Sequence, residues 1–291
     1  MEQIQSSELI INSNGSIYHI NLKPEQVAKT VILVGDQDRV GMISKYFDTI
    51  EFNSKHREFV ASTGTYKGKR ITVLSTGIGT DNIDIVVNEL DALVNIDFAM
   101  RQIKPNHTKL ELIRLGTTGA IQPGISVGSI IKTEVSIGFD GLLNFYANRD
   151  KITNQKIEKA FLKHTQWNKK LARPYFVKAS DLLLKKFKAH YLPGITISAP
   201  GFYGPQGRVL RIPLADTNIN SKIESFIFDE RVITNFEMES SAIYGLAKHL
   251  GHEAITICAV IANRSTKTFD NNYNKTVEQM IKGTLDVLVG K

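Results

Sequence analysis

The sequence predicts a single α/β domain of three layers, α/β/α, with helices on both faces of a central mixed β-sheet. Two observations predict it. Short β-branched runs alternate with helix-like patterns along the chain, and neither a repeat nor a Pro/Ser-rich linker divides the 291 residues. Apolar residues make up 42% of the chain, enough for a sizeable core. We expect one domain over residues 1–291, with 1–16 as a loosely ordered N-terminal extension.

Strands are expected where apolar and β-branched residues run together. These runs are 30–34, 59–62, 71–75, 110–115, 129–137, 195–198, 232–236 and 253–262. Helical periodicity predicts one helix after Arg39, another after Asp81 and a third over 179–191. A further helix is expected to end at a C-terminal cap at Gly251. Asp81 itself reads as the N-cap of its helix. A closing helix is expected over 276–289. In such sheets ligands bind beyond the carboxyl ends of strands, so polar strand ends are the candidate sites.

Composition narrows the classes of partner. The formal net charge of +7 could serve nucleic acid, a membrane surface or a small anion, but the lysines scatter as on a solvated helix face. Residues 1–14 do not resemble a secretory signal, and no window approaches the ~20 apolar residues of a membrane span. We expect a cytoplasmic protein with no nucleic-acid or membrane partner. The single cysteine, Cys258, lies in an apolar run and is expected to be a small buried residue in a reducing compartment.

Two strand ends are suited to an anion. Gly35 permits a sharp turn, and Arg39 opens a helix whose free N–H groups favour negative charge. Arg114 lies inside an apolar strand, where an unpaired charge costs several kcal/mol. The glycines and threonines of 116–119 follow it and offer a cradle for a tetrahedral oxyanion. The alternatives are a surface arginine at 39, and pairing of Arg114 with a structural carboxylate such as Glu111.

Two further segments are suited to a nucleoside. Glu237 and Glu239 flank Met238 where a strand meets a helix, and a carboxylate can accept from two vicinal sugar hydroxyls. Paired catalytic acids, metal ligands or an ordinary first helical turn are the alternatives, although no His or Cys stands at ligand spacing. In 202–208, an aromatic ring, a glutamine and an arginine offer stacking and the mixed hydrogen bonds that a uracil edge requires. An ordinary surface loop is the other interpretation.

The order of these motifs resembles the nucleoside phosphorylase superfamily, and most closely the bacterial uridine phosphorylases. The matching stretches are Gly-Asp-x-x-Arg-Val at 35–40, Ser-Lys-His-Arg-Glu-Phe at 54–59, Ser-Thr-Gly-Ile-Gly at 75–79, Arg-Leu-Gly-Thr-Thr-Gly-Ala-Ile-Gln-Pro at 114–123, Gln-x-Arg at 206–208 and Asn-Phe-Glu-Met-Glu-Ser at 235–240. The resemblance covers about residues 17–290. It implies a phosphorylase/hydrolase-like fold and a pentosyltransferase that splits a nucleoside with inorganic phosphate as co-substrate, without a cofactor.

The resemblance also implies residue roles. Phosphate would be held by Gly35, Arg39, Arg57, Arg114 and Thr117. The ribose would be met by His19, Glu237, Met238 and Glu239. The base would lie among Thr118, Gly119, Phe202, Gln206, Arg208, Ile261, Ala262 and Arg264. Of these, Arg114, Glu239, Gln206 and Arg208 are the expected catalytic residues.

The resemblance further implies an oligomer. Arg57 and His19 would reach a neighbouring subunit's site, so a dimer is the minimum, and the family usually forms hexamers as trimers of dimers. Glu58 and Ser75 match positions where some relatives hold a monovalent cation, K⁺, between subunits.

The chemistry fits these roles. Phosphate would attack C1′ as the ribose gains oxocarbenium character, and Gln206 and Arg208 would stabilise the negative charge on the departing base. Purine phosphorylases and the related hydrolytic nucleosidases place an aspartate where this chain has Asn263 and Arg264, which favours a pyrimidine. A purine or broad-range phosphorylase is the alternative enzyme. A catalytically silent nucleoside- or phosphate-binding protein, and a basic nucleic-acid binder, are the alternatives of another class.

Three segments depart from the uridine phosphorylase pattern. The usual Pro-Gly-Asp-Pro is Val34-Gly35-Asp36-Gln37 here. The loop 140–180 is longer and contains an aromatic, basic stretch around Trp167 and Arg173, and the segment 204–212 is altered around its Gln and Arg. The last two departures are expected near or over the base pocket. These departures leave open which base is preferred, but they do not affect the expected phosphate chemistry.

Overall fold

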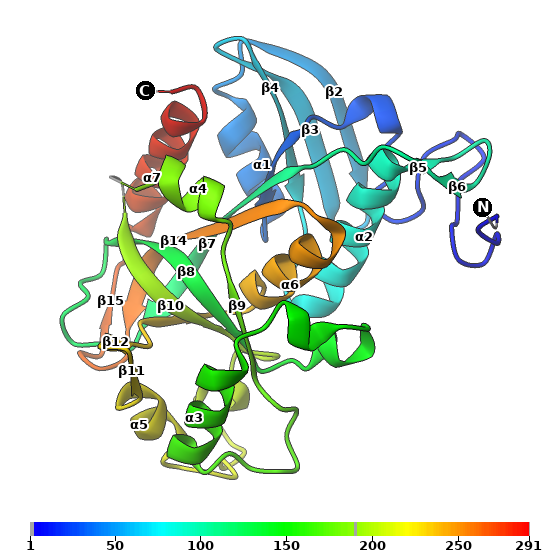
Figure 1. Ribbon diagram of the computed structural model, residues 1–291. Coiled ribbons are helices and arrows are strands. Elements are labelled where there is room, and N and C mark those ends of the chain that lie inside the picture. The colour runs from blue at the N-terminus through cyan, green and yellow to red at the C-terminus, as the bar shows by residue number, and fades with distance from the viewer. Residues whose placement is uncertain (1–2, 189–190, 291) are drawn as a thin grey trace.

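The computed structural model describes residues 3–188 and 191–290, and these residues form the predicted three layers (Figure 1). Its central mixed sheet has 11 strands in the order β15-β14-β8-β10-β13-β7-β1-β4-β3-β2, with β9 paired to β8. The strands are β1 (Thr30–Val34), β2 (Thr49–His56), β3 (Phe59–Tyr66), β4 (Lys69–Ser75), β7 (Glu111–Ala120), β8 (Ile130–Gly138), β9 (Tyr175–Lys178), β10 (Leu192–Ser198), β13 (Asn235–Glu237), β14 (Glu253–Asn263) and β15 (Thr268–Phe269). Two small ribbons stand apart, β5 (Ile96–Asp97) with β6 (Gln102–Ile103) and β11 (Ile227–Phe228) with β12 (Arg231–Val232).

The sheet closes on itself through its long strand β14. This strand runs parallel to β7 along its length and antiparallel to β8 over residues 256–259. The pairings β8–β10, β10–β13 and β13–β7 complete a ring, from which β1, β4, β3 and β2 extend as an open sheet. The alternation of strands and helices predicts the layers, but not this closure, because closure depends on pairings between distant segments.

Helices cover both faces because side chains alternate along each buried strand. In β1, Val31 and Leu33 pack with α2 (Thr80–Asn95) and α6 (Ser240–Leu250). Ile32 and Val34 point to the other face, toward α1 (Gln37–Ser44), α4 (Asp181–Lys186) and α7 (Tyr273–Leu288). A third apolar cluster joins β8 and β10 to α3 (Gln155–Thr165) and α5 (Ile219–Glu224), at the lower end of Figure 1.

Several expected element boundaries are wrong. Helix α2 begins at Thr80 after Gly79, whose φ of 100° is a conformation that favours glycine, so Asp81 lies in the first turn and is not the cap. The helix expected over 179–191 is the shorter α4, and residues 189 and 190 lie outside the described part. The single strand expected over 232–236 is divided between β12 and β13.

Two further segments contact the rest of the domain. In residues 3–16, Leu9 is buried, and the Arg101 guanidinium donates to the Ile4 carbonyl at 2.8 Å and to that of Gln5 at 2.9 Å. The segment 140–180, expected as a long loop, contains α3 and β9 and packs Trp167 against Phe139. Within residues 3–188 and 191–290, no helix is long and apolar enough to cross a bilayer.

Candidate active site

A cavity of about 1120 Å³ lies where β7, β13 and β14 meet the loops after β1 and β4. Its wall includes most of the expected site residues: Gly35, Arg39, Arg114, Thr117, Thr118, Gly119, Phe202, Gln206, Arg208, Glu237, Met238, Glu239, Ile261 and Ala262. Segments more than two hundred residues apart in the chain are thus brought to one place. His19, Arg57, Ser75 and Arg264 do not line this cavity.

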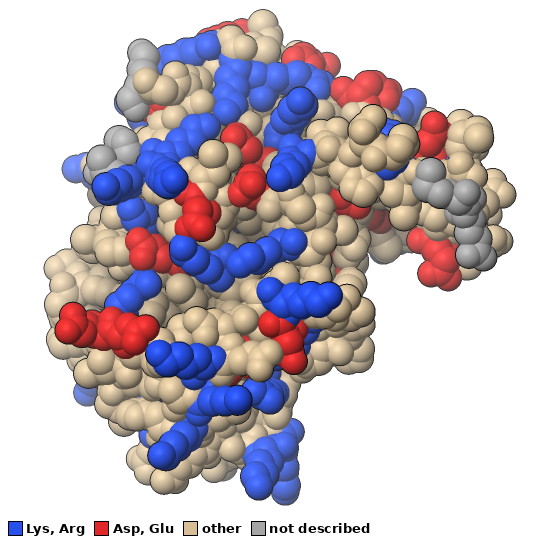
Figure 2. All heavy atoms as spheres, in the orientation of Figure 1, with Lys and Arg blue, Asp and Glu red and all other residues tan. Residues whose placement is uncertain are grey.

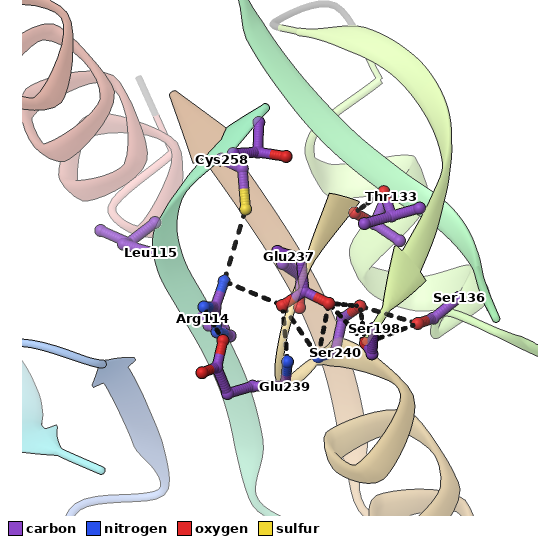
Figure 3. Close-up of polar contacts among 12 residues, drawn as sticks. Arg114, Leu115, Thr133, Ser136, Ser198, Glu237, Glu239, Ser240 and Cys258 are labelled. Atoms are coloured by element: carbon purple, nitrogen blue, oxygen red, sulfur yellow. Dashed lines mark hydrogen bonds and ion pairs between the residues drawn. The ribbon is translucent and has the colours of Figure 1, made fainter. Parts of the chain in front are cut away.

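Arg114 lies at the centre of this wall with 6% of its side chain exposed. One Nη forms a short ion pair with Glu239, and the other lies 3.3 Å from Glu237 and 3.4 Å from the Cys258 sulfur (Figure 3). The expected alternative partner, Glu111, is wrong, because its carboxylate accepts from Thr30 and lies near lysines at the far end of β7. Arg114 therefore faces the pocket, and its counter-charges are the carboxylates expected at the ribose.

Gly116 makes this placement of Arg114 possible. A Cβ atom at Gly116 would collide with the Arg114 guanidinium, so a larger residue would displace the arginine from the wall. Burial and the two acids act in opposite directions on these groups. Burial disfavours the charged arginine, but Glu239 and Glu237 raise the pKa of Arg114 above its ordinary value. Burial raises the pKa of Glu239, and Arg114 opposes that rise.

Two guanidinium groups, those of Arg39 and Arg114, lie on one wall of the pocket. Arg39, in the first turn of α1, donates to the Leu115 carbonyl at 3.3 Å. Burial, and then the nearby positive charge of Arg114, lower the pKa of Arg39. Like charges held close together in a partly buried wall favour an anion between them. Gly35 and Thr117 lie on the same wall, as expected.

The carboxyl side of the pocket is formed at the start of α6. Glu239 is the N-cap residue of this helix, and its Oε1 accepts from the Gly79 amide at 2.8 Å. The pocket also touches Met238 and Glu237, and the Glu237 and Glu239 side chains are 1% and 4% exposed. Two buried carboxylates thus lie on this side of the pocket.

A second pair of arginines, Arg208 and Arg264, contacts the segment 202–208. Arg208 Nη1 donates to Gln206 Oε1 at 2.7 Å, and its Cζ atom lies 3.7 Å from the centre of the Phe202 ring. Arg264 lies behind the wall, where its guanidinium donates to the Gln206 carbonyl and packs over Phe236. Burial and then Arg208 lower the pKa of Arg264 to about 9. Neither arginine forms an ion pair with an acid of the described residues, so the positive charge here is uncompensated.

His19 and Arg57 lie together outside this cavity. His19 Nδ1 is 2.6 Å from Glu89 Oε1, and Arg57 lies 5.5 Å from the Tyr18 ring centre. The Arg57 carbonyl nevertheless accepts from Gln37, a pocket residue, at 3.1 Å. Within one chain the structure does not bring these two side chains to the site.

The proposed cation positions are only partly together. Glu58 lines the pocket, but the Ser75 hydroxyl donates to the Glu58 carbonyl at 2.6 Å and accepts from the Val60 amide at 2.7 Å. No group of three or more His, Cys, Asp or Glu side chains suited to a metal ion occurs in residues 3–188 and 191–290.

Sequence reasoning missed some of the wall. Gly77, Ile78, Asn82 and Phe269 also line the cavity. The turn before α2 is rich in glycine, a signal that could have identified the first three, whereas Phe269 reaches the wall only because β15 pairs back onto β14. The segment 140–180 lines no part of the cavity. Of the altered segment 204–212, Gln206 and Arg208 line the wall, while Leu210 and Ile212 are exposed.

Comparison with known proteins places this geometry among relatives. The model of the Phosphorylase superfamily matches residues 29–288. A uridine phosphorylase of Thermococcus kodakarensis is 34% identical over 271 residues, covering 92% of this chain and 85% of its own length. A purine nucleoside phosphorylase of Listeria welshimeri is 26% identical over 246 residues, covering 83% and 85%. The crystal structure of a Trypanosoma brucei nucleoside phosphorylase, reported to show uridine phosphorylase activity, superimposes with a TM-score of 0.87 at 30% identity and covers 97% of this chain and 100% of its own.

Proposed function

The chain belongs to the phosphorylase superfamily, and we propose that it is an enzyme that splits uridine with inorganic phosphate, giving uracil and ribose 1-phosphate. The similarity to uridine phosphorylases covers nearly the whole chain, so the proposal does not depend on one motif. The single observation that carries it is the placement of Arg39 and Arg114 on one wall with Glu239. Two cations suited to phosphate thereby stand next to a carboxylate suited to a sugar.

We propose that substrate binding rearranges the Arg114–Glu239 ion pair. The ribose 2′- and 3′-hydroxyls donate to Glu239. Phosphate replaces Glu239 as the partner of Arg114 and also accepts from Arg39. Gly35 and Thr117 complete the phosphate cradle, and Met238 packs under the sugar. Each charge-assisted hydrogen bond contributes ~1.5–3 kcal/mol. These exchanged partners offset the loss of the closed ion pair.

The reaction follows from this arrangement. A phosphate oxygen forms a bond to C1′ while the C1′–N1 bond breaks. The electron pair of the broken C1′–N1 bond leaves with the base. Negative phosphate stabilises the oxocarbenium character at C1′. Gln206 and Arg208 line the pocket where charge develops on the base, Arg264 supports Gln206 from behind, and neither arginine pairs with an acid among the described residues. Catalysis is thus positioning and electrostatics, with phosphate as co-substrate and no organic cofactor.

The base end favours a pyrimidine. An aspartate placed to protonate a purine is replaced by Asn263, whose amide donates to the carbonyls of Gln122 and Ile125 at 2.9 and 2.6 Å. Asn263 is therefore committed to holding the loop. Thr118 is similarly committed, because its hydroxyl donates to the Phe236 carbonyl at 2.6 Å. A purine or broad-range phosphorylase remains the second candidate, on the similarity to the Listeria enzyme.

The complete site is proposed to form between two subunits. His19 and Arg57 lie on one surface outside their own pocket, as the role in a neighbour's site requires. A dimer is the minimum, and a hexamer of three dimers is the proposed assembly. A K⁺ ion at Glu58 and Ser75 and a cytoplasmic location also remain predictions.

One assay tests the function. The protein is incubated with uridine, with inosine, and with each in the presence and absence of phosphate, and base and ribose 1-phosphate are quantified. We expect equal amounts of uracil and ribose 1-phosphate, formed only with phosphate, and slower release of hypoxanthine. Base released without phosphate would indicate a hydrolase, and no release under any condition would favour a silent binding protein.

A further inference from the structure

Glu237 occupies a different position from Glu239, although the two are separated by one residue. Its carboxylate lies behind Arg114, at the end of β13, where it is 1% exposed. Oε2 accepts from the amides of Glu239 and Ser240 at 2.9 and 3.0 Å and lies 3.3 Å from Arg114 Nη1. Glu237 therefore contacts both the arginine and the first turn of α6.

The other oxygen of Glu237 is occupied by hydroxyl groups. Oε1 accepts a short hydrogen bond from Ser198 and a 2.6 Å bond from Ser240 Oγ (Figure 3). A carboxylate has about four lone-pair directions, and here amides, hydroxyls and a guanidinium take them all. No acceptor remains for a sugar hydroxyl.

The groups around Ser198 and Ser240 determine that both hydroxyls donate to Glu237. Ser198 Oγ accepts from the Ser241 amide at 2.9 Å, so its own proton is free to go to Glu237. Ser136 Oγ lies 2.7 Å from Ser240 Oγ and can donate to it, which leaves the Ser240 proton for Glu237 as well. Every polar atom of the group thereby finds a partner, the condition under which a buried polar network is rigid.

From this arrangement we propose that Glu237 is a positioning residue for Arg114 and not a ribose ligand, and that Ser198 is the residue that fixes Glu237. The proposal rests on the phosphorolysis proposed above. Ser198 and Glu237 are direct neighbours in the parallel pairing of β10 with β13, so the strand register sets their contact. Through the contact between Ser198 and Glu237, strand β10 orients Arg114, which lies on β7, a strand with which β10 does not pair.

The test uses Ser198→Ala and Glu237→Gln, with Ser136→Ala as the matched control. Ser136→Ala loses the same hydroxyl from the same cluster; Ser136 contacts the hydroxyls of Ser240 and Ser198 but neither Glu237 nor Arg114. For each protein, the KM for phosphate, kcat/KM for uridine and for 2′-deoxyuridine, and the Tm are measured. Phosphate binding without nucleoside is measured by calorimetry, so that the proposal is tested even if the wild type proves not to be a phosphorylase.

Ser198→Ala is expected to raise the KM and the Kd for phosphate about tenfold, the size of one charge-assisted hydrogen bond. Its preference for uridine over 2′-deoxyuridine stays that of the wild type, and Ser136→Ala leaves the phosphate constants within about twofold. The double variant Ser198→Ala/Glu237→Gln binds phosphate no more weakly than Glu237→Gln alone, because Ser198 acts through Glu237.

Three results would overturn the proposal: unchanged phosphate constants in Ser198→Ala, a lowered Tm as the only effect, or a selective loss of uridine over 2′-deoxyuridine in Glu237→Gln. The last would make Glu237 a ribose ligand. A wild type that releases no base with phosphate would instead refute the proposed function, and the calorimetric comparison would still decide the role of Ser198.

Discussion

Arg114 and Glu239 form a buried ion pair on the pocket wall, and each is the expected partner of a different substrate. The arginine is suited to phosphate and the carboxylate to ribose. In the structure these two side chains neutralise each other, and both substrates must bind to replace the partner that each side chain loses. Removing one member takes from the other its short ion pair, so mutations here are expected to affect both activity and stability.

Arg114→Ala is expected to lower kcat/KM by about 10²–10³-fold or more, because a charge that meets the transition state is removed. It also leaves Glu237 and Glu239 without their cation, at a cost of about 3–5 kcal/mol in the free energy of unfolding. Steady-state kinetics and chemical denaturation measure the two effects. Unchanged kinetics at saturating phosphate would contradict the assignment of the cradle.

The stability loss in Arg114→Ala should depend on pH. Burial already raises the pKa of Glu239, and the variant lacks the arginine that opposes the rise. A carboxyl with a raised pKa in the folded state favours folding at low pH, and this contribution is lost as the pH rises through that pKa. Melting curves should show a Tm deficit, relative to wild type, that is largest at neutral pH and shrinks toward pH ~4. A Tm deficit that is constant over this pH range would show that the raised pKa of Glu239 does not cause the loss of stability.

Arg264→Met is expected to raise the Tm of the protein and to lower its kcat. The Arg264 guanidinium is largely buried beside Arg208, and burial followed by Arg208 lowers its pKa to about 9. Removing an uncompensated charge of this kind raises Tm by ~2–4 °C, about 1 kcal/mol for a chain of this size. The kcat for uridine should fall because Gln206, which lines the pocket, loses the guanidinium that holds it from behind. A lower Tm with unchanged kcat would identify a structural arginine instead.

Asn263→Asp should not convert the protein to a purine phosphorylase. The Asn263 amide donates to two carbonyls, and its oxygen accepts from the Ser265 amide at 2.9 Å. An aspartate would direct a carboxylate oxygen at those carbonyls, at a cost of about 1–3 kcal/mol or more. We expect a lower Tm and no gain in inosine cleavage. A gain of inosine activity at unchanged stability would favour the purine interpretation.

Mixing two inactive variants tests the shared site. Arg57→Ala lacks the residue proposed for the neighbour's pocket, and Arg114→Ala lacks its own pocket residue. When the two are unfolded together and refolded, a random dimer mixture contains about a quarter of the wild-type number of intact sites. Activity should recover to about that level. Mixtures as inactive as the separate variants, with dimers verified by light scattering, would place Arg57 outside the site.

The layers, and the residues of the strand ends and of the loop 202–208 that line the cavity, could be predicted because they depend on local patterns: apolar runs, glycine turns and polar residues at strand ends. The ring closed by β14 depends on distant pairing and was not predictable in that way. The cap of α2 was misplaced because an aspartate is a commoner cap than Gly79. The resemblance places both Glu237 and Glu239 at the ribose; both line the pocket, but Glu237 also accepts from Ser198 across a strand pairing. That distinction requires the register of two strands, which no single segment contains.

The central claim is that Arg114 leaves Glu239 to hold a free phosphate beside a ribose. A crystal structure with phosphate and a uridine analogue that resists cleavage tests it most directly. The account predicts phosphate held by Arg39, Arg114 and the partner subunit's Arg57, with both ribose hydroxyls on Glu239. Arg114 still closed on Glu239, with the phosphate bound elsewhere, would contradict it.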